Sequence, residues 1–138
     1  MKPGASVTLP PLISVIDDDD GMRDAISALL ELHDVDCEGF RSAVEFLTTY
    51  QPGRHDCIIS DVMMPGIDGI ELQKHLKARG ATVPIVFVTS SNCERVHARA
   101  MSGGAIRVLR KPVTDEDLMS ALETALGSGV ALPLDTHP

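Results

Sequence analysis

The sequence predicts an α/β protein with a doubly wound, five-stranded parallel sheet, and two observations carry this prediction. Short continuous apolar runs alternate with longer segments in which apolar residues recur at helical spacing. That pattern is typical of strands covered on both faces by helices. The alternation repeats five times in 138 residues, which suits one domain with right-handed crossovers. We expect this domain at 12–126, after a flexible segment 1–11 and before a flexible tail or start of a linker at 127–138.

Five short strands are expected along the chain. The runs LISVI and PIVFV are uninterrupted and apolar, as strands buried on both faces must be. The run after the first helix is the weakest of the five, because it contains two charged residues. The expected ranges are 12–16, 35–38, 57–60, 84–88 and 106–109.

Helices are expected between these strands. Apolar residues at helical spacing predict the first over 20–33. The other four begin after a residue that can cap a helix, each followed three residues later by an acidic side chain, which is the capping-box pattern. These caps are Ser42, Asp68, Ser91 and Thr114. The helix after Ser91 would place Cys93, Val96, Ala100 and Met101 on one apolar face.

Composition and charge exclude several classes of protein. The formal net charge is -8 and the pI is about 4.9, so a phosphate backbone would be repelled and nucleic-acid binding through this chain is not expected. No apolar stretch is long enough to span a membrane, and the first residues do not resemble a secretory signal. Three cysteines without a CxxC pair favour a reducing, cytoplasmic location over a disulfide framework or a zinc site.

Chemistry-bearing side chains follow four of the five strands. Asp17 and Asp18 come after the first strand, Asp61 after the third, Thr89 after the fourth and Lys111 after the fifth. In a parallel sheet the carboxyl ends of the strands lie along one edge, where open α/β proteins bind their ligands. We therefore expect these side chains to form a single site.

The residue types in this site favour phosphoryl transfer. Three carboxylates in one pocket repel each other unless a cation lies among them, and hard oxygen ligands in an open site suit Mg²⁺. A lysine and a hydroxyl beside them can hold the remaining oxygens of a phosphoryl group. A carboxylate can itself be the nucleophile and become an aspartyl phosphate.

Four segments, in this order, resemble the receiver (CheY-like) domain of a two-component response regulator: VIDDDDGMR, ISDVMMPGIDG, VFVTS and LRKPV. They are spread through residues 12–126. The spacing between the first apolar strand, the paired Asp residues and the following Arg is most similar to the FixJ-like branch. The resemblance implies a flavodoxin-like (βα)5 fold with strand order 2-1-3-4-5.

The resemblance also implies a role for each site residue. Asp61 would accept a phosphoryl group from a sensor histidine kinase or a phosphotransfer protein, and Thr89 would hydrogen-bond the phosphate and move toward it. Lys111 would pair with a phosphate oxygen, and Lys111–Pro112 would be a cis peptide. Mg²⁺ would be held by Asp17, Asp18, Asp61 and the backbone carbonyl of Met63. No turnover of an external substrate is expected.

The sequence departs from the family pattern at two positions. Val108 stands where the family has an aromatic or His residue three positions before the lysine, and Val113 stands where Phe usually follows the Lys-Pro pair. Both belong to the face formed by the fourth helix, the fifth strand and the fifth helix. The resemblance implies a switch that involves Thr89 and position 108, with a phosphorylation-dependent homodimer possible through that face. Val108 places the usual form of this coupling in question.

Two other functions fit parts of the sequence. The run Asp18–Gly21 matches the DxDG loop of small haloacid-dehalogenase-like phosphatases, in which Asp18 would be the nucleophile and Asp61 would be dispensable. Alternatively, the fold would serve only as a docking or dimerisation module that does not depend on phosphorylation.

Overall fold

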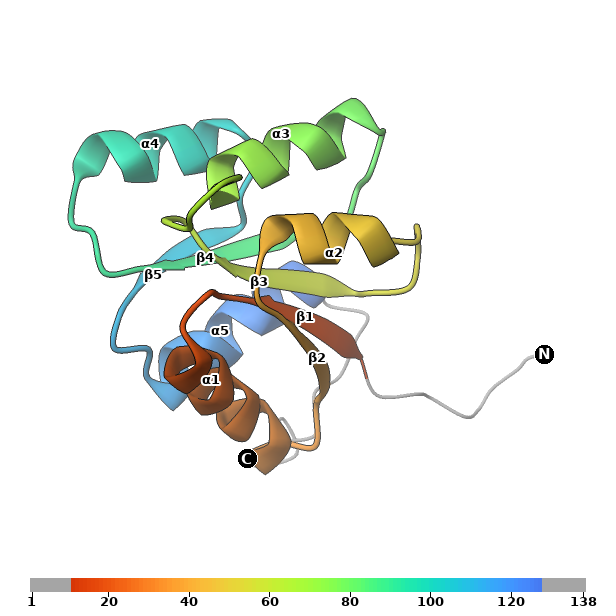
Figure 1. Ribbon diagram of the computed structural model, residues 1–138. Helices are drawn as coiled ribbons and strands as arrows, with labels where there is room; N and C mark the ends of the chain where they lie inside the picture. Colours follow the sequence, from red (N-terminus) through yellow and green to blue (C-terminus); the bar gives the residue numbers. More distant parts are fainter. Residues whose placement is uncertain (1–10, 128–138) are drawn as a thin grey trace.

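The computed structural model describes residues 11–127, which form one parallel sheet with helices on both faces (Figure 1). All strand pairs are parallel and the order is β2-β1-β3-β4-β5, so the expected fold class and strand order are confirmed. The strands are β1 Leu12–Ile16, β2 Asp36–Phe40, β3 Cys57–Asp61, β4 Ile85–Thr89 and β5 Arg107–Arg110.

Five helices cover the sheet. They are α1 Asp20–Leu32, α2 Ala43–Thr49, α3 Gly69–Ala78, α4 Glu94–Ser102 and α5 Asp115–Leu126. Figure 1 shows α1 and α5 on one face and α2, α3 and α4 on the other. Because side chains alternate along each strand, the core is divided into two clusters. One packs against Leu30 and Leu122, and the other against Phe46 and Leu72.

The central strands are fully covered. Every residue of β3 and β4 is buried, as expected for parallel strands between two layers of helices. The only phenylalanine rings are Phe40, Phe46 and Phe87, so most of the core is aliphatic. This packing fixes the carboxyl ends of β3 and β4, where the candidate site residues lie.

Strand boundaries differ slightly from those expected. β2 covers Asp36–Phe40 rather than 35–38, while β4 and β5 each lie one residue further along the chain than predicted. Asp61 and Thr89 are the last residues of β3 and β4. Their backbones are therefore held by the sheet itself.

The predicted helix caps are partly correct. The capping box of Asp68 and Glu71 is complete, and the hydroxyls of Ser42 and Thr114 cap α2 and α5. The box at Ser42 is only half formed, because the Glu45 carboxylate accepts a hydrogen bond from the backbone N–H of Arg41 instead of closing on Ser42.

The prediction for the start of α4 was wrong. Cys93, not Ser91, is the N-cap residue, and its side chain makes no capping hydrogen bond. The Ser91 hydroxyl instead accepts a hydrogen bond from the Cys93 backbone N–H at 3.0 Å, which forms a turn before the helix. The expected apolar face is also shorter, because Cys93 is exposed and Met101 is 48% exposed.

The flexible segments expected at 1–11 and 127–138 lie outside the described residues, except for Pro11 and Gly127. Among the helices of residues 11–127, none is long and apolar enough to cross a membrane.

Candidate functional site

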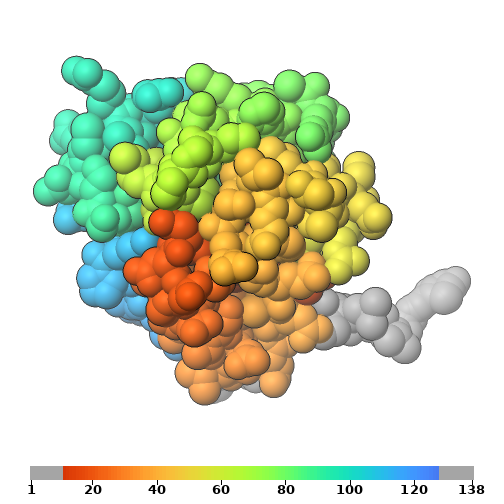
Figure 2. Space-filling view, viewed as in Figure 1, coloured from red at the N-terminus to blue at the C-terminus, as the bar shows by residue number. Residues whose placement is uncertain are grey.

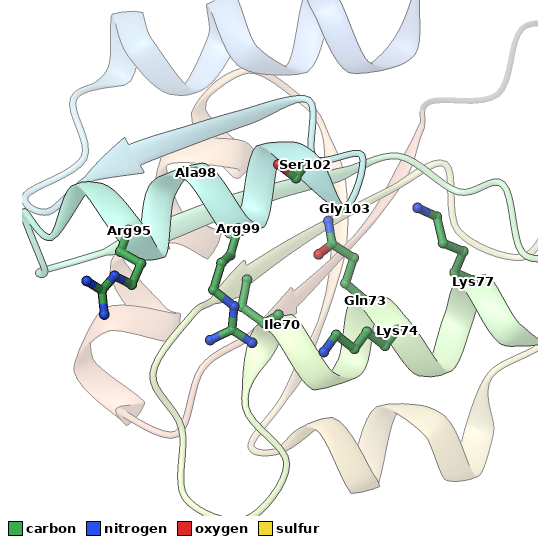
Figure 3. Close-up of a pocket in the computed structure, with 9 residues that line it drawn as sticks. All are labelled: Ile70, Gln73, Lys74, Lys77, Arg95, Ala98, Arg99, Ser102 and Gly103. Atoms are coloured by element: carbon green, nitrogen blue, oxygen red, sulfur yellow. The ribbon is translucent and has the colours of Figure 1, made fainter.

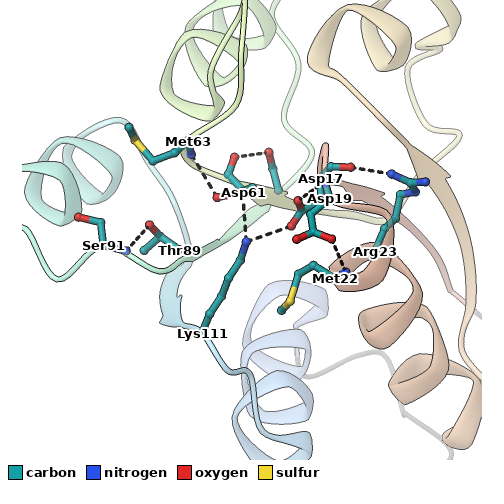
Figure 4. Close-up of polar contacts among 10 residues, drawn as sticks. Asp17, Asp19, Met22, Arg23, Asp61, Met63, Thr89, Ser91 and Lys111 are labelled. Carbon is teal, nitrogen blue, oxygen red and sulfur yellow. Dashed lines mark hydrogen bonds and ion pairs between the residues drawn. The ribbon is translucent and has the colours of Figure 1, made fainter.

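The carboxyl ends of the strands bring the predicted site residues together (Figure 4). Asp17 follows β1, Asp61 and Thr89 end β3 and β4, and Lys111 follows β5. Asp61 pairs with Val88, the residue before Thr89, and the backbone N–H of Lys111 donates to the Thr89 carbonyl at 2.8 Å. In Figure 2 the red segment around the start of α1 lies against the yellow-green loop after β3.

Lys111 links the two buried carboxylates of the site. Its Nζ lies 3.0 Å from Oδ2 of Asp61 and 3.2 Å from Oδ2 of Asp17. The Lys111–Pro112 peptide is cis, as the family resemblance implies. Only 19% of the lysine side chain is exposed. The ammonium therefore faces the carboxylates and not bulk solvent.

Burial and nearby charges shift the pKa values of Asp61 and Lys111 in opposite directions. Burial raises the pKa of Asp61, and the nearby charge of Asp17 adds to the rise, while hydrogen bonds from Lys111 and from the Met63 backbone N–H oppose it. For Lys111, burial alone would lower the pKa, but the contacts with Asp61 and Asp17 outweigh it and the pKa is raised. The lysine is thus held as a cation, and the site favours a further positive charge beside Asp61.

Three carboxylates form a group that could hold a metal ion. Asp17, Asp18 and Asp61 each offer an oxygen, and these oxygens all lie within 4.8 Å of one another. Asp17 and Asp61 are buried whereas Asp18 is exposed, so the group opens to solvent on one side. Oxygen-only donors of this kind fit Mg²⁺ better than zinc. The Met63 backbone N–H donates to Oδ1 of Asp61 at 3.1 Å, and its side chain is 59% exposed.

The turn between β1 and α1 is held from two sides. The Asp19 backbone N–H donates to Oδ1 of Asp17 at 2.9 Å, and Nη1 of Arg23 donates to the Asp17 carbonyl at 2.8 Å. Arg23 also pairs with Asp20, and the Asp19 carboxylate caps α1. Of the four consecutive aspartates, the first two therefore belong to the acidic group and the last two to the helix start.

Thr89 is completely buried, with 0% exposure, and it connects the site to α4. Its Oγ1 accepts a hydrogen bond from the Ser91 backbone N–H at 3.0 Å. This bond uses the oxygen as acceptor and leaves the O–H proton available to donate. The Ser91 carbonyl in turn lies 3.1 Å from Nε2 of His97, in the first turns of α4. Ser91 and His97 were not identified as a link from the sequence, where nothing but their spacing relates them.

Gly69 packs closely against the backbone of Asp61. A Cβ at this position would lie 2.5 Å from the Asp61 carbonyl oxygen and 2.8 Å from the Phe87 ring. Gly69 is the first residue of α3, directly after the cap residue Asp68. The helix can approach the end of β3 this closely only because no side chain is present.

Val108 lies beside β4 in the position opposite Phe87. It is partly buried and packs against the core cluster on the α3 and α4 side. A small aliphatic side chain therefore occupies the place where the family usually has a ring.

Comparisons with known proteins agree with this geometry. The model of the response regulator receiver domain family matches residues 13–123. The transcriptional regulatory protein FixJ of Azorhizobium caulinodans is 38% identical over 115 residues, which is 83% of this chain and 54% of that protein. The chain thus spans about half the length of this curated relative.

Solved structures show the same similarity. The crystal structure of FixJ-N superposes with a TM-score of 0.81 at 25% identity, covering 91% of this chain and all of that one. The response regulator StyR superposes with a TM-score of 0.79 at 38% identity, covering 86% of this chain and 60% of that one. Neither the phosphatase nor the pure docking module is favoured by these matches. The chain belongs to the response regulator receiver domain family and is a FixJ-like member of it.

Proposed function

We propose that this receiver domain accepts a phosphoryl group on Asp61 from a sensor histidine kinase or a phosphotransfer protein. The observation that carries the proposal is the position of Lys111, whose ammonium lies between Asp61 and Asp17 at 3.0 and 3.2 Å. Asp61 thereby contacts the lysine directly, and the carboxylates of Asp17 and Asp18 lie beside it.

We assign the metal site to Mg²⁺, with ligands from Asp17, Asp18, Asp61 and the backbone carbonyl of Met63. The three converging carboxylates support this assignment, since their mutual repulsion needs a cation. The rise of the Asp61 pKa on burial supports it as well. When bound, the ion would neutralise charge on the oxygens of the transferred phosphoryl group.

The transfer itself needs positioning and charge neutralisation. A carboxylate oxygen of Asp61 attacks the phosphorus of a phosphohistidine, the P–N bond breaks, and its electron pair returns to the imidazole of the donor. Lys111 then exchanges its contact with the Asp61 carboxylate for one with a phosphoryl oxygen. The Thr89 hydroxyl donates to another phosphoryl oxygen, for which its proton is available.

Intact-protein mass spectrometry with a small phosphodonor and Mg²⁺ tests the proposal. The wild-type chain should gain the mass of one phosphoryl group, and hydroxylamine should remove it as expected for an acyl phosphate. Asp61→Asn should gain nothing. Asp24→Asn, at an exposed position of α1, is the matched control and should react as the wild type does. A phosphoryl group that Asp61→Asn still acquires would refute the assignment.

The output of the switch is proposed to pass through α4. The bonds from Thr89 to Ser91 and from Ser91 to His97 support this route, because a shift of Thr89 toward a phosphate would pull on the turn before α4. Because position 108 is a valine, no aromatic ring is present there to move in behind Thr89 when it shifts. The output of the switch would be a phosphorylation-dependent homodimer formed through α4, β5 and α5. We expect no turnover of an external substrate. Light scattering of the phosphorylated chain measures dimer formation.

In the whole protein we propose that this switch controls transcription, since the relative from Azorhizobium caulinodans is named a transcriptional regulatory protein. The acidic chain described above is not expected to bind nucleic acid itself. A cytoplasmic location fits the three cysteines, which are all free thiols.

A further inference from the structure

A groove of about 440 Å³ lies between α3 and α4, on the outer side of the layer that these helices form. Figure 3 shows its residues coming from both helices. Four of them are cationic, namely Lys74, Lys77, Arg95 and Arg99. None of the residues in the acidic group or beside it lines the groove, so it is separate from the proposed phosphorylation site.

The groove gathers four cations on one surface of an acidic protein, which has 12 Lys and Arg residues against 20 Asp and Glu residues. Among the other described cations, Arg23, Arg54 and Lys111 are paired with carboxylates, whereas the side chains of Arg41, Arg79, Arg107 and Arg110 form no ion pair. Within residues 11–127, no ion pair or hydrogen bond is formed by the side chains of the four groove cations. Four positive charges are therefore concentrated on one surface without a counterion from the chain.

The floor of the groove is apolar and tightly built. Ile70 is 5% exposed at its base, and Ala98 lines the α4 side. Gln73 is buried and donates from Nε2 to the Ala100 carbonyl at 3.0 Å, which ties α3 to α4. Its amide occupies the space that a Cβ on Gly103 would need. The packing of two helices thus fixes the shape of the groove, while its cationic side chains are exposed to solvent.

We propose that this groove binds a nucleotide-sized phosphate ester, with its phosphates on the lysine and arginine side chains and its organic part over Ile70 and Ala98. Guanidinium and ammonium groups are the usual partners of phosphate. At one end of the groove Ile70 and Arg95 lie in the first turns of their helices, where the helix dipoles add positive potential, whereas Lys77 and Ser102 lie at the opposite, C-terminal end. The site goes beyond the proposed phosphorylation of Asp61 and does not depend on it.

The size of the groove favours a small ligand over a protein segment. Pockets for small organic molecules are usually about 300–1,000 Å³, with a mainly apolar lining and a few polar groups. The groove falls within that range. A bare inorganic anion would use the cations but would leave the apolar floor in contact with water, so an organic part attached to the phosphates should add affinity.

Calorimetric titration of the full chain with ATP tests the proposal, in a buffer with EDTA so that no divalent ion fills the acidic group. Lys74→Gln combined with Arg99→Gln should weaken ATP binding by about tenfold or more. The matched control is Arg41→Gln combined with Arg110→Gln, which removes the same charge at two exposed positions outside the groove. It should change the Kd by less than about twofold.

Three outcomes would overturn the proposal. Equal weakening by both double variants would show attraction by the overall charge alone. Tripolyphosphate that binds as tightly as ATP would show that the apolar floor contributes nothing. A hexaglutamate peptide that binds more tightly than ATP would assign the groove to an acidic protein partner. Amide chemical shifts in the wild-type chain provide an independent readout, because ATP should shift Ile70 and Gly103 and leave the β2 signals unchanged.

Discussion

Nζ of Lys111 lies 3.0 Å from Oδ2 of Asp61, although fifty residues separate the two in the sequence. The cation comes from the residue after β5 and reaches Asp61 past the end of β4, and the same ammonium also contacts Asp17. One lysine thus contacts both buried carboxylates and offsets part of their negative charge. When it is absent, both are left without a cation in a poorly solvated site.

Lys111→Met should therefore destabilise the chain when no divalent ion is present. Loss of the partner of a buried carboxylate should lower the free energy of unfolding by about 1–3 kcal/mol. Added Mg²⁺ should return part of this loss, because a second cation can replace the ammonium. Urea unfolding with EDTA and with Mg²⁺ measures both effects. Lys77→Met, on the exposed side of α3, should change little, and equal stability of the two variants in EDTA would contradict the role given to Lys111.

Asp61→Asn should have the opposite effect on stability at neutral pH. Burial raises the pKa of Asp61 above its ordinary value of 3.8, so the folded state favours the protonated carboxyl. The stabilisation of the folded state by an uncharged side chain at this position is complete below pH 3.8 and is lost as the pH rises through the raised pKa. Asparagine is uncharged at every pH, so the variant retains this stabilisation at pH 7.

The melting temperature of Asp61→Asn in EDTA should therefore exceed that of the wild type by a few degrees, about 2–5 °C. The difference should disappear below about pH 3.8, where both side chains are uncharged. Thermal unfolding at several pH values measures it. A lower melting temperature for the variant at pH 7 would mean that the bond to Lys111 outweighs the cost of burial.

Glu38 gives a pH dependence of the reverse sign. Its pKa is lowered from 4.5, first by the hydrogen bond from Arg54 and then by that from His55. The stabilisation is present above 4.5 and is lost as the pH falls through the lowered pKa. Glu38→Gln should therefore be less stable at pH 7, by no more than about 1 kcal/mol because the pair is partly exposed. The difference should fade on acidification, and a constant difference down to pH 3 would contradict the ionic origin.

The sequence was sufficient to predict the order of the elements and the convergence of the site residues, because both follow from parallel topology. Asp17, Asp61 and Lys111 meet wherever the strands of such a sheet end together. Contacts that depend on loop shape were not predictable. Ser91 fitted a helix cap in sequence, yet in the structure its backbone joins Thr89 to His97.

The environment of His55 was missed for a similar reason. The residue lies in a polar turn of the sequence, but its ring packs against Phe40 and Phe46 with centroid distances of 5.9 and 5.8 Å. Its Nε2 lies 2.7 Å from the Glu38 carboxylate. Neither contact has a local pattern, since the partners belong to β2 and α2. Burial of a turn residue depends on which elements pack beside it.

Gly69 is the position where a single methyl group should disturb the site most. The Cβ of Gly69→Ala would lie 2.5 Å from the Asp61 carbonyl oxygen and 2.8 Å from the Phe87 ring, and neither backbone nor buried ring can yield easily. Overpacking of this kind typically costs about 1–3 kcal/mol. The shift of Asp61 should also slow its reaction with a phosphodonor relative to the wild type.

Gly21→Ala is the control for this prediction. It adds the same methyl group inside α1, where the nearest atom is the Asp19 carboxylate at 3.3 Å, and alanine favours the helix by up to about 1 kcal/mol. The free energy of unfolding measured with urea and the initial rate of phosphorylation should both fall for Gly69→Ala. Both should remain near wild type for Gly21→Ala. If Gly69→Ala loses stability but reacts at the wild-type rate, α3 moves away and Asp61 stays in place. The close approach would then serve packing alone.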